Sequence, residues 1–109
     1  MGIVITVMSG VEDGKIIELS KTPFVLGRHP DDDVCLPYDT KVSRHHARVT
    51  KEDILHFIED VGPEGKGSTN GTFVNEKRVT SKTSISTGDT ILLGGVWVKF
   101  EVRHKEQGI

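Results

Sequence analysis

Short runs in which apolar residues alternate with other residues recur along the whole chain, as in β-strands with one buried face. Ile3, Ile5 and Val7 form the first such run. An Asp-Gly pair at 13–14 and a Gly-Gly pair at 94–95 each predict a hairpin turn. The expected strands are residues 3–8, 15–19, 24–28, 34–36, 47–50, 54–60, 72–74, 77–80, 89–93 and 96–102.

Two kinds of connection join these strands. Tight turns are predicted at residues 51–53 and at Asn75-Glu76, whereas residues 38–46 and 62–71 are predicted as long loops. Apolar residues nowhere recur at helical spacing over three turns. The pattern therefore predicts an all-β sandwich of about ten or eleven short strands, with its loops gathered at the ends. Trp97 suits either the core or an interface.

The length and composition suit a single domain. We expect residues 1–109 to form it, with a core from about residue 3 to residue 102 and a polar tail at 103–109. Lys and Arg number 14 against 16 Asp and Glu, and this net charge of −2 argues against a nucleic-acid partner. Cys35 is the only cysteine, so no intrachain disulfide can form. Without a signal peptide or an apolar run of roughly 20 residues, we expect a cytoplasmic protein with no membrane partner.

Three loop motifs carry chemistry suited to anions. They are Gly27-Arg28, Ser43-Arg44-His45-His46 and Ser68-Thr69-Asn70-Gly71-Thr72. A guanidinium group donates paired hydrogen bonds to phosphate, and a hydroxyl beside an arginine can bind the same anion. Asn70 has donors and an acceptor for a peptide backbone, and His46 can hold its loop by bonding backbone groups. A phosphate group is therefore the leading candidate ligand.

Each motif alone also has a simpler explanation. Arg28 can be a solvated surface side chain, Ser43 can cap a helix, and residues 68–72 can form a plain turn. However, no helical pattern follows Ser43. Adjacent His45 and His46 on a strand would point to opposite faces, which argues against a shared metal ion. Because no complete catalytic constellation or P-loop is present, we expect no metal, no cofactor and no enzymatic activity.

The order and spacing of the motifs together resemble the forkhead-associated (FHA) domain. The matching elements are Gly27-Arg28, Ser43-Arg44-x-His46, Asn70-Gly71-Thr72, Val74-Asn75 and Thr87-Gly88-Asp89-Thr90-Ile91. The resemblance covers residues 3–102 and implies a twisted β-sandwich of two sheets with about eleven short strands, of the SMAD/FHA type. Its loops at one end would bind an extended phosphothreonine peptide. Segment 61–67 departs from it, because it lengthens the loop before Ser68 and can shift Ser68 or add Lys66 as a contact.

The resemblance also implies which residues meet the phosphopeptide. Arg28 and Ser43 would contact the phosphate, and Arg44 occupies a neighbouring position that often helps. Thr69 and Asn70 would approach the peptide, with Asn70 bonding its main chain.

Other matching positions would shape or tune the site. Gly27, His46 and Gly71 match positions that hold the loops in place rather than contact the ligand. Lys41 matches a position that can read the side chain three residues after the phosphothreonine, where a lysine would favour an acidic residue.

We therefore predict a non-enzymatic phosphothreonine-peptide-binding module that recruits a partner protein phosphorylated by a Ser/Thr kinase. Threonine would be preferred to serine, because the family's site accommodates the threonine methyl group. A first alternative is an FHA-fold domain that binds a protein partner independently of phosphate. A second is a β-fold hydrolase that uses His46. The sequence does not identify the partner or the kinase.

Overall fold

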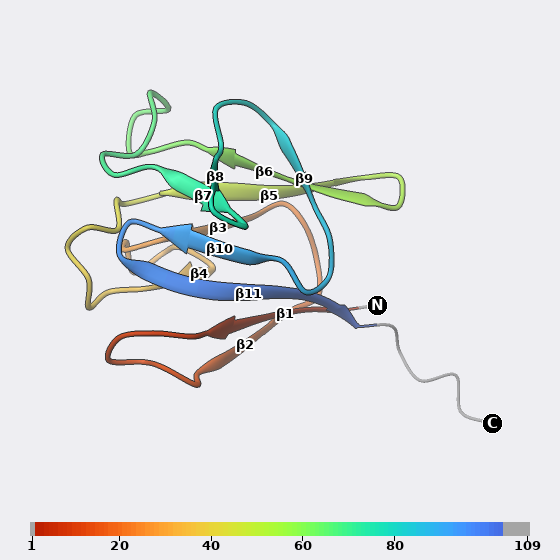
Figure 1. Ribbon diagram of the computed structural model, residues 1–109, viewed down its shortest axis with the longest axis horizontal. Helices are drawn as coiled ribbons and strands as arrows, with labels where there is room; N and C mark the ends of the chain where they lie inside the picture. Colours follow the sequence, from red (N-terminus) through yellow and green to blue (C-terminus); the bar gives the residue numbers. More distant parts are fainter. Residues whose placement is uncertain (1, 104–109) are drawn as a thin grey trace.

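The computed structural model describes residues 2–103, which contain eleven strands and no helix (Figure 1). The predicted all-β sandwich is confirmed. The strands are β1 (Gly2–Val7), β2 (Ile16–Leu19), β3 (Phe24–Gly27), β4 (Val34–Cys35), β5 (Ala47–Glu52), β6 (Leu55–Asp60), β7 (Thr72–Val74), β8 (Lys77–Arg78), β9 (Thr83–Ile85), β10 (Thr90–Leu93) and β11 (Val96–Arg103). Nothing in this range could cross a bilayer as a helix. Beyond Arg103, the expected polar tail lies outside the described residues.

The strands form two sheets that pack face to face (Figure 1). One sheet has six strands in the order β2-β1-β11-β10-β7-β8, and the other has five in the order β4-β3-β5-β6-β9. Neighbouring strands are antiparallel except for the short parallel pair of β3 and β4. The first and last strands are neighbours, and Gly2 lies opposite Arg103.

The hydrophobic core lies between the sheets and is built from alternate residues of the strands. In β11, Val96, Val98 and Phe100 are buried, whereas Trp97 points to the other face and is only partly buried. Trp97 therefore belongs to the outer face of the six-stranded sheet and not to the core. The largest fully buried apolar side chains are Phe24, Phe100, Ile5, Leu26, Ile58, Ile91 and Leu93.

Two details of the strand pattern differ from expectation. The hairpin predicted to turn at 51–53 is present, but its turn lies at Asp53 and Ile54 because β5 continues to Glu52. Asp53 has a φ of 61°, and Ile54 is 79% exposed, so this isoleucine belongs to the turn and not to a strand. Strand β9 was not among those predicted, since Ile85 is its only buried residue.

The tight turn predicted at Asn75-Glu76 is confirmed. Both residues have positive φ, 46° and 73°, as a type I′ hairpin turn requires. The Asn75 carboxamide also donates to the Asp89 carboxylate at 3.0 Å and accepts from the Thr90 amide at 3.1 Å. These bonds fasten the turn to the start of β10.

Candidate functional site

The loops that carry the three motifs meet at one end of the sandwich, on the left in Figure 1. They are the β3–β4 loop (28–33), the β4–β5 loop (36–46) and the β6–β7 loop (61–71). The β10–β11 turn joins them, because the Gly94 amide donates to the Gly71 carbonyl at 3.4 Å. Gly2 and Arg103 lie at the opposite end. Residues that are distant in the sequence therefore share one surface.

Gly27 permits a close approach of the first two loops. A Cβ atom there would lie 2.6 Å from the His45 amide nitrogen and 2.9 Å from that of His46, and it would overlap the Asp32 carboxylate. Asp32 is buried and accepts hydrogen bonds from the amides of His29 at 3.1 Å and His45 at 3.0 Å. His45 Nδ1 also lies 2.5 Å from Asp32 Oδ1. Asp32 thus ties the loops together in the space that glycine leaves open.

Arg28 follows β3 and is anchored at one edge of its guanidinium group. Its Nε donates to the Val42 carbonyl at 2.8 Å, and its backbone amide donates to the Ser43 carbonyl at 3.1 Å. Within residues 2–103, the terminal guanidinium nitrogens have no acceptor. Arg28 is therefore positioned by the β4–β5 loop while its terminal donors remain available to an anion.

The Ser43 hydroxyl lies between the β4–β5 and β6–β7 loops. Its oxygen accepts a hydrogen bond from the Thr69 amide at 3.1 Å, and the residue is 7% exposed. Because the oxygen acts as the acceptor there, the hydroxyl hydrogen remains free to donate. The neighbouring Arg44 is exposed and has no polar partner in the described part of the chain. The Ser43 hydroxyl donor is thus followed in the sequence by Arg44, which like Arg28 has unpaired guanidinium nitrogens in the described part of the chain.

His46 is fully buried and bridges the two loops. Its Nδ1 accepts from the Ser43 amide at 2.9 Å, so the ring hydrogen is on Nε2, which donates to the Gly71 carbonyl at 2.9 Å. Burial lowers the pKa of His46, which keeps the ring neutral and suits one accepting and one donating nitrogen. This ring therefore sets the spacing between Ser43 and the β6–β7 loop.

Asp60, at the end of β6, organises the second half of the site. Its carboxylate accepts from the Ser68 amide at 2.6 Å, the Ser68 hydroxyl at 2.5 Å and the Thr72 hydroxyl at 2.6 Å. Burial alone would raise the pKa of Asp60, but these hydrogen bonds, with a smaller contribution from His46, hold it below its usual range. Asp60 is therefore charged at neutral pH and fixes both ends of the motif from Ser68 to Thr72.

The long segment before Ser68 closes on itself. Gly67 donates its amide to the Val61 carbonyl at 2.7 Å, and the amide of Val61 donates to the His46 carbonyl at 2.9 Å. The extra residues therefore leave the chain close to where they started, and Ser68 meets Asp60. The Lys66 side chain is 85% exposed, and its ammonium lies 3.9 Å from the Glu64 carboxylate.

Asn70 and Lys41 join the β4–β5 and β6–β7 loops at the surface. Both residues are exposed, and the Asn70 side-chain amide donates to the Lys41 carbonyl at 2.9 Å. Asn70 keeps its side-chain oxygen as an acceptor, and the Lys41 ammonium has no acidic partner in the range 2–103. Gly71 has a φ of 87°, which turns the chain into β7.

The structure places all of the predicted site residues in these loops or, for Gly27, at the end of β3 directly before them. They are Gly27, Arg28, Lys41, Ser43, Arg44, His46, Thr69, Asn70 and Gly71. Sequence reasoning missed Asp32 and Asp60, whose signal was only an aspartate beside a predicted strand or motif. In the described range, no three His, Cys, Asp or Glu side chains gather as metal ligands. The arrangement offers guanidinium, hydroxyl and amide groups to an external anion.

Comparisons with known proteins agree with this geometry. The model of the FHA domain family matches residues 24–94. The chain is 31% identical over 90 residues to FHA domain-containing protein FhaB of Mycobacterium tuberculosis, covering 83% of this chain and 54% of FhaB. It is 36% identical over 90 residues to the glycogen accumulation regulator GarA of the same species, covering 83% of this chain and 51% of GarA. The chain thus spans about half the length of these curated relatives.

A solved FHA domain is similar throughout its length. That structure, from work on phosphothreonine-dependent FHA domain interactions, superposes with a TM-score of 0.78 at 27% identity and covers 95% of this chain and 99% of its own. The family resemblance expected from the motifs is confirmed. The matched segment includes Arg28, Ser43 and Asn70 and takes up more than half of the chain. The chain therefore belongs to the FHA domain family.

Proposed function

We propose that this domain binds proteins that carry a phosphorylated threonine, and that it acts as a recruitment module without catalytic activity. The observation that supports this most directly is the state of Arg28. Its guanidinium is anchored through Nε beside Ser43, and its terminal nitrogens have no acceptor within residues 2–103. A cation held in place without an acidic partner is suited to an external anion.

The groups around Arg28 match the needs of a phosphate. A phosphorylated threonine carries roughly −1.5 to −2 charges at pH 7 and three acceptor oxygens. Arg28 and Ser43 would donate to these oxygens, and the neighbouring Arg44 would add positive charge. Hydrogen bonds to charged groups contribute on the order of 1.5–3 kcal/mol each. Three such bonds would make phosphorylation decisive for binding.

The surface around the phosphate would hold the peptide in an extended form. The side-chain oxygen of Asn70 is placed to accept from a peptide amide, with Thr69 beside it, since the Asn70 amide is engaged with the Lys41 carbonyl. Lys41 would favour an acidic residue three positions after the phosphothreonine. Gly27, His46 and Gly71 would act indirectly, by holding the loops.

Two solved FHA domains that are similar to this chain support the assignment, because each is described by the interaction it makes. The solved FHA domain at 27% identity belongs to work on phosphothreonine-dependent interactions. A second solved neighbour, at 28% identity, is the FHA domain of FhaA complexed with the intracellular domain of another protein. By analogy, the partner of this chain would be a cytoplasmic protein phosphorylated by a Ser/Thr kinase.

A pair of degenerate peptide libraries tests the proposal. One is centred on phosphothreonine and the other on threonine, and each is titrated by fluorescence anisotropy. We expect binding only to the phosphorylated library and its loss in Arg28→Ala. Arg28→Lys keeps the charge but loses the paired donors, so it should bind weakly. Arg103→Ala, an equivalent change at the opposite end, is the control and should bind normally.

Two outcomes would contradict the proposal. Equal binding to both libraries would favour recognition of a partner that is independent of phosphate. Unchanged phosphopeptide binding by Arg28→Ala would place the phosphate elsewhere on the surface. Circular dichroism of each variant should show the same strand content as the original chain, so that loss of binding is not confused with loss of folding.

A further inference from the structure

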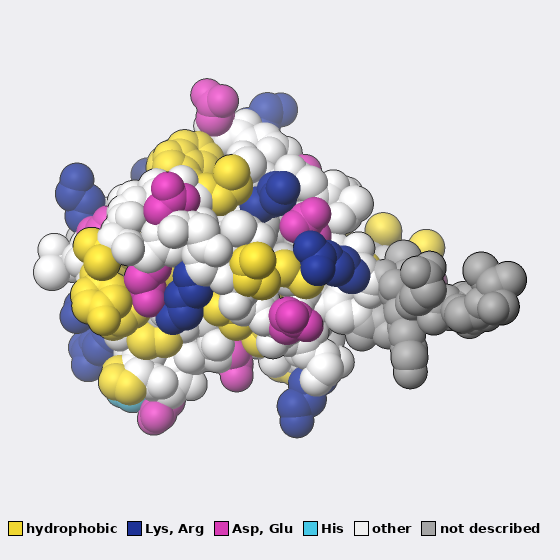
Figure 2. All heavy atoms as spheres, turned by 90° about the horizontal axis from the view of Figure 1, so that it is seen from below, with side chains coloured by type: hydrophobic (Ala, Val, Ile, Leu, Met, Phe, Trp, Pro, Cys, Tyr) yellow, Lys and Arg dark blue, Asp and Glu magenta, His cyan; other side chains and the backbone are white. Residues whose placement is uncertain are grey.

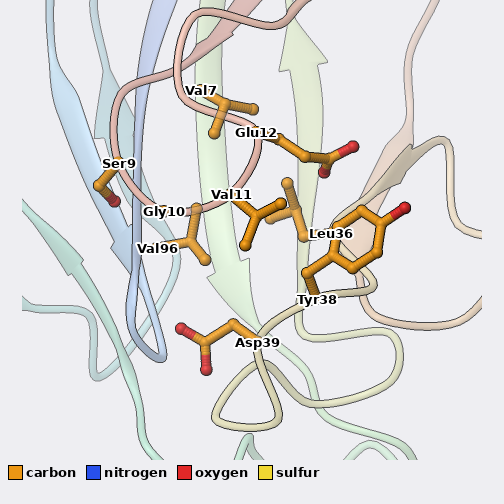
Figure 3. Close-up of a pocket in the computed structure, with 9 residues that line it drawn as sticks. All are labelled: Val7, Ser9, Gly10, Val11, Glu12, Leu36, Tyr38, Asp39 and Val96. Carbon is orange, nitrogen blue, oxygen red and sulfur yellow. The ribbon is translucent and has the colours of Figure 1, made fainter.

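A small pocket opens at the same end of the sandwich as the phosphate-binding loops (Figure 3). It has a volume of about 110 Å³ and lies between the β1–β2 loop (8–15), the β4–β5 loop and the start of β11. Its walls include Val11, Glu12, Leu36, Tyr38, Asp39 and Val96. None of these residues belongs to the phosphate-binding motifs.

The walls of the pocket are mostly apolar, and two of its hydrophobic residues are unusually exposed. Val11 is 81% exposed and Tyr38 is 67% exposed, whereas Leu36 and Val96 form a buried floor. In Figure 3, Val11 lies between Val96 and Tyr38, with Leu36 behind it. Figure 2 shows hydrophobic side chains gathered at this end of the molecule, on the left. Exposed apolar residues around a hollow indicate a surface for a partner.

The volume of the pocket limits which chemical groups can enter it. A cavity of about 150 Å³ lined by apolar side chains holds a benzene molecule. This pocket is somewhat smaller at about 110 Å³, and it is open to solvent. It therefore fits one aliphatic side chain of an approaching chain and is too small for a cofactor.

The pocket is continuous with the phosphate site through the β4–β5 loop. Asp39 forms part of the rim, its carboxylate accepts from the Lys41 amide at 2.8 Å, and its carbonyl accepts from the Val42 amide at 3.0 Å. Ser43 follows directly. The Cα atoms of Asp39 and Ser43 can be at most about 15 Å apart. An extended peptide covers about 3.3 Å per residue, so the rim lies within about five residues of a phosphothreonine bound at Ser43.

The charge on the rim adds a second feature. The Glu12 carboxylate is paired with the Lys15 ammonium at 2.9 Å. Asp39 forms no ion pair with any residue between 2 and 103, and its carboxylate lies at the edge of the pocket beside Gly95, below Val96 in Figure 3. The phosphate site is cationic, whereas this rim is acidic. A peptide that fits both would carry a basic residue next to the side chain that enters the pocket.

We infer that the pocket is a second subsite for the same phosphopeptide, and this inference rests on the proposed function. It takes an aliphatic side chain within about five residues of the phosphothreonine, with a lysine or arginine beside it. The phosphate site then detects whether a protein is phosphorylated. The pocket selects among phosphorylated proteins by their more distant sequence.

The test is a phosphothreonine peptide library with randomised positions on both sides. We expect enrichment of an aliphatic residue at one position in that range, with Lys or Arg next to it. The selected peptide and a version with alanine at the aliphatic position are then titrated against Val11→Asp. Burial of one aliphatic side chain predicts about tenfold weaker binding of the selected peptide to this variant. The alanine peptide should bind the variant and the original chain equally.

Two further variants separate the possible causes. Ile54→Asp makes the same change at an equally exposed residue of the β5–β6 turn, at the other end of the molecule, and should bind both peptides normally. Asp39→Asn keeps an oxygen for the Lys41 amide but removes the charge, so it should lose only the preference for Lys or Arg.

The outcomes distinguish this inference from the proposed function. Phosphopeptide binding without aliphatic enrichment would overturn the inference and leave the proposed function standing. Equal weakening of both peptides by Val11→Asp would do the same, since the change would then act outside the pocket. If no phosphopeptide binds the original chain, the proposed function fails and the inference fails with it.

Discussion

Replacing the bridging histidine should reveal how much of the fold depends on the site. His46→Phe keeps a ring of similar size but removes both of its hydrogen bonds. The Ser43 amide would then lie buried without a partner, and the Gly71 carbonyl would keep only its longer bond from the Gly94 amide at 3.4 Å. The unsatisfied amide costs about 1–3 kcal/mol and the lost carbonyl bond about 0.5–1.5 kcal/mol, so the variant should lose about 1.5–4.5 kcal/mol of unfolding free energy. That is a large part of the 5–15 kcal/mol typical of a small domain.

The chain contains its own control for this change. His56 is also buried, at 4% exposed, and it packs edge-on against Phe100. Its Nε2 has no hydrogen-bond partner among the described residues. His56→Phe therefore removes an unsatisfied polar atom rather than a pair of bonds, and we expect it to be neutral or stabilising. The same substitution at two buried histidines should thus have opposite effects.

Thermal and urea unfolding followed by circular dichroism would measure both variants. His46→Phe should lower Tm by roughly 7–20 °C, and His56→Phe should leave Tm unchanged or raise it. Phosphopeptide binding should fall in the first variant, because its loops lose their spacing, and persist in the second. A similar loss of stability in both variants would refute the reasoning, since the cost would then come from the volume of the ring and not from its hydrogen bonds.

The remaining predictions concern loop packing and pH. Gly27→Ala would press a methyl group against the Asp32 carboxylate and the neighbouring amides, so urea titration should show a loss of about 1–3 kcal/mol and peptide titration a loss of affinity. Burial lowers the pKa of His46, and burial together with the charge of Lys51 lowers that of His56. Stability should therefore be constant above the ordinary histidine pKa of 6.5 and fall below it, by at most about 1.4 kcal/mol per pH unit for each histidine. A flat profile between pH 7 and 5 would contradict the assignment of two buried neutral rings.

The strands were predictable wherever one face is buried over several residues. In β11, buried and outward residues alternate from Val96 to Phe100, and the sequence displays that alternation directly. Prediction from this pattern fails where an apolar residue is exposed, or where a strand buries too few side chains to show alternation. Ile54 is apolar but exposed in a turn, whereas β9 buries only Ile85. A period of two cannot be recognised in a strand of three residues with one buried side chain.

The site was predictable as a set of motifs but not as an assembly. Arg28 and Ser43 have side chains whose chemistry suits phosphate, and that property is visible in the sequence. Asp32 and Asp60 act on backbone amides and hydroxyls that lie next to them only after folding. An acidic residue that binds another loop has no local signature, because the distance that matters is set by the packing of the sheets. The pairing of β1 with β11 was hidden for the same reason.

The pairing of Gly2 with Arg103 also has a mechanical consequence. Tension applied at these two residues pulls directly apart a pair that sits at the same end of adjacent antiparallel strands. The bonds between β1 and β11 would then carry the load one after another, as in a zipper, and not all at once. Single-molecule stretching should accordingly show less resistance along this direction than along one that shears the two strands. Under such tension the domain would open first at the end farthest from Arg28, so an attached partner would be released late.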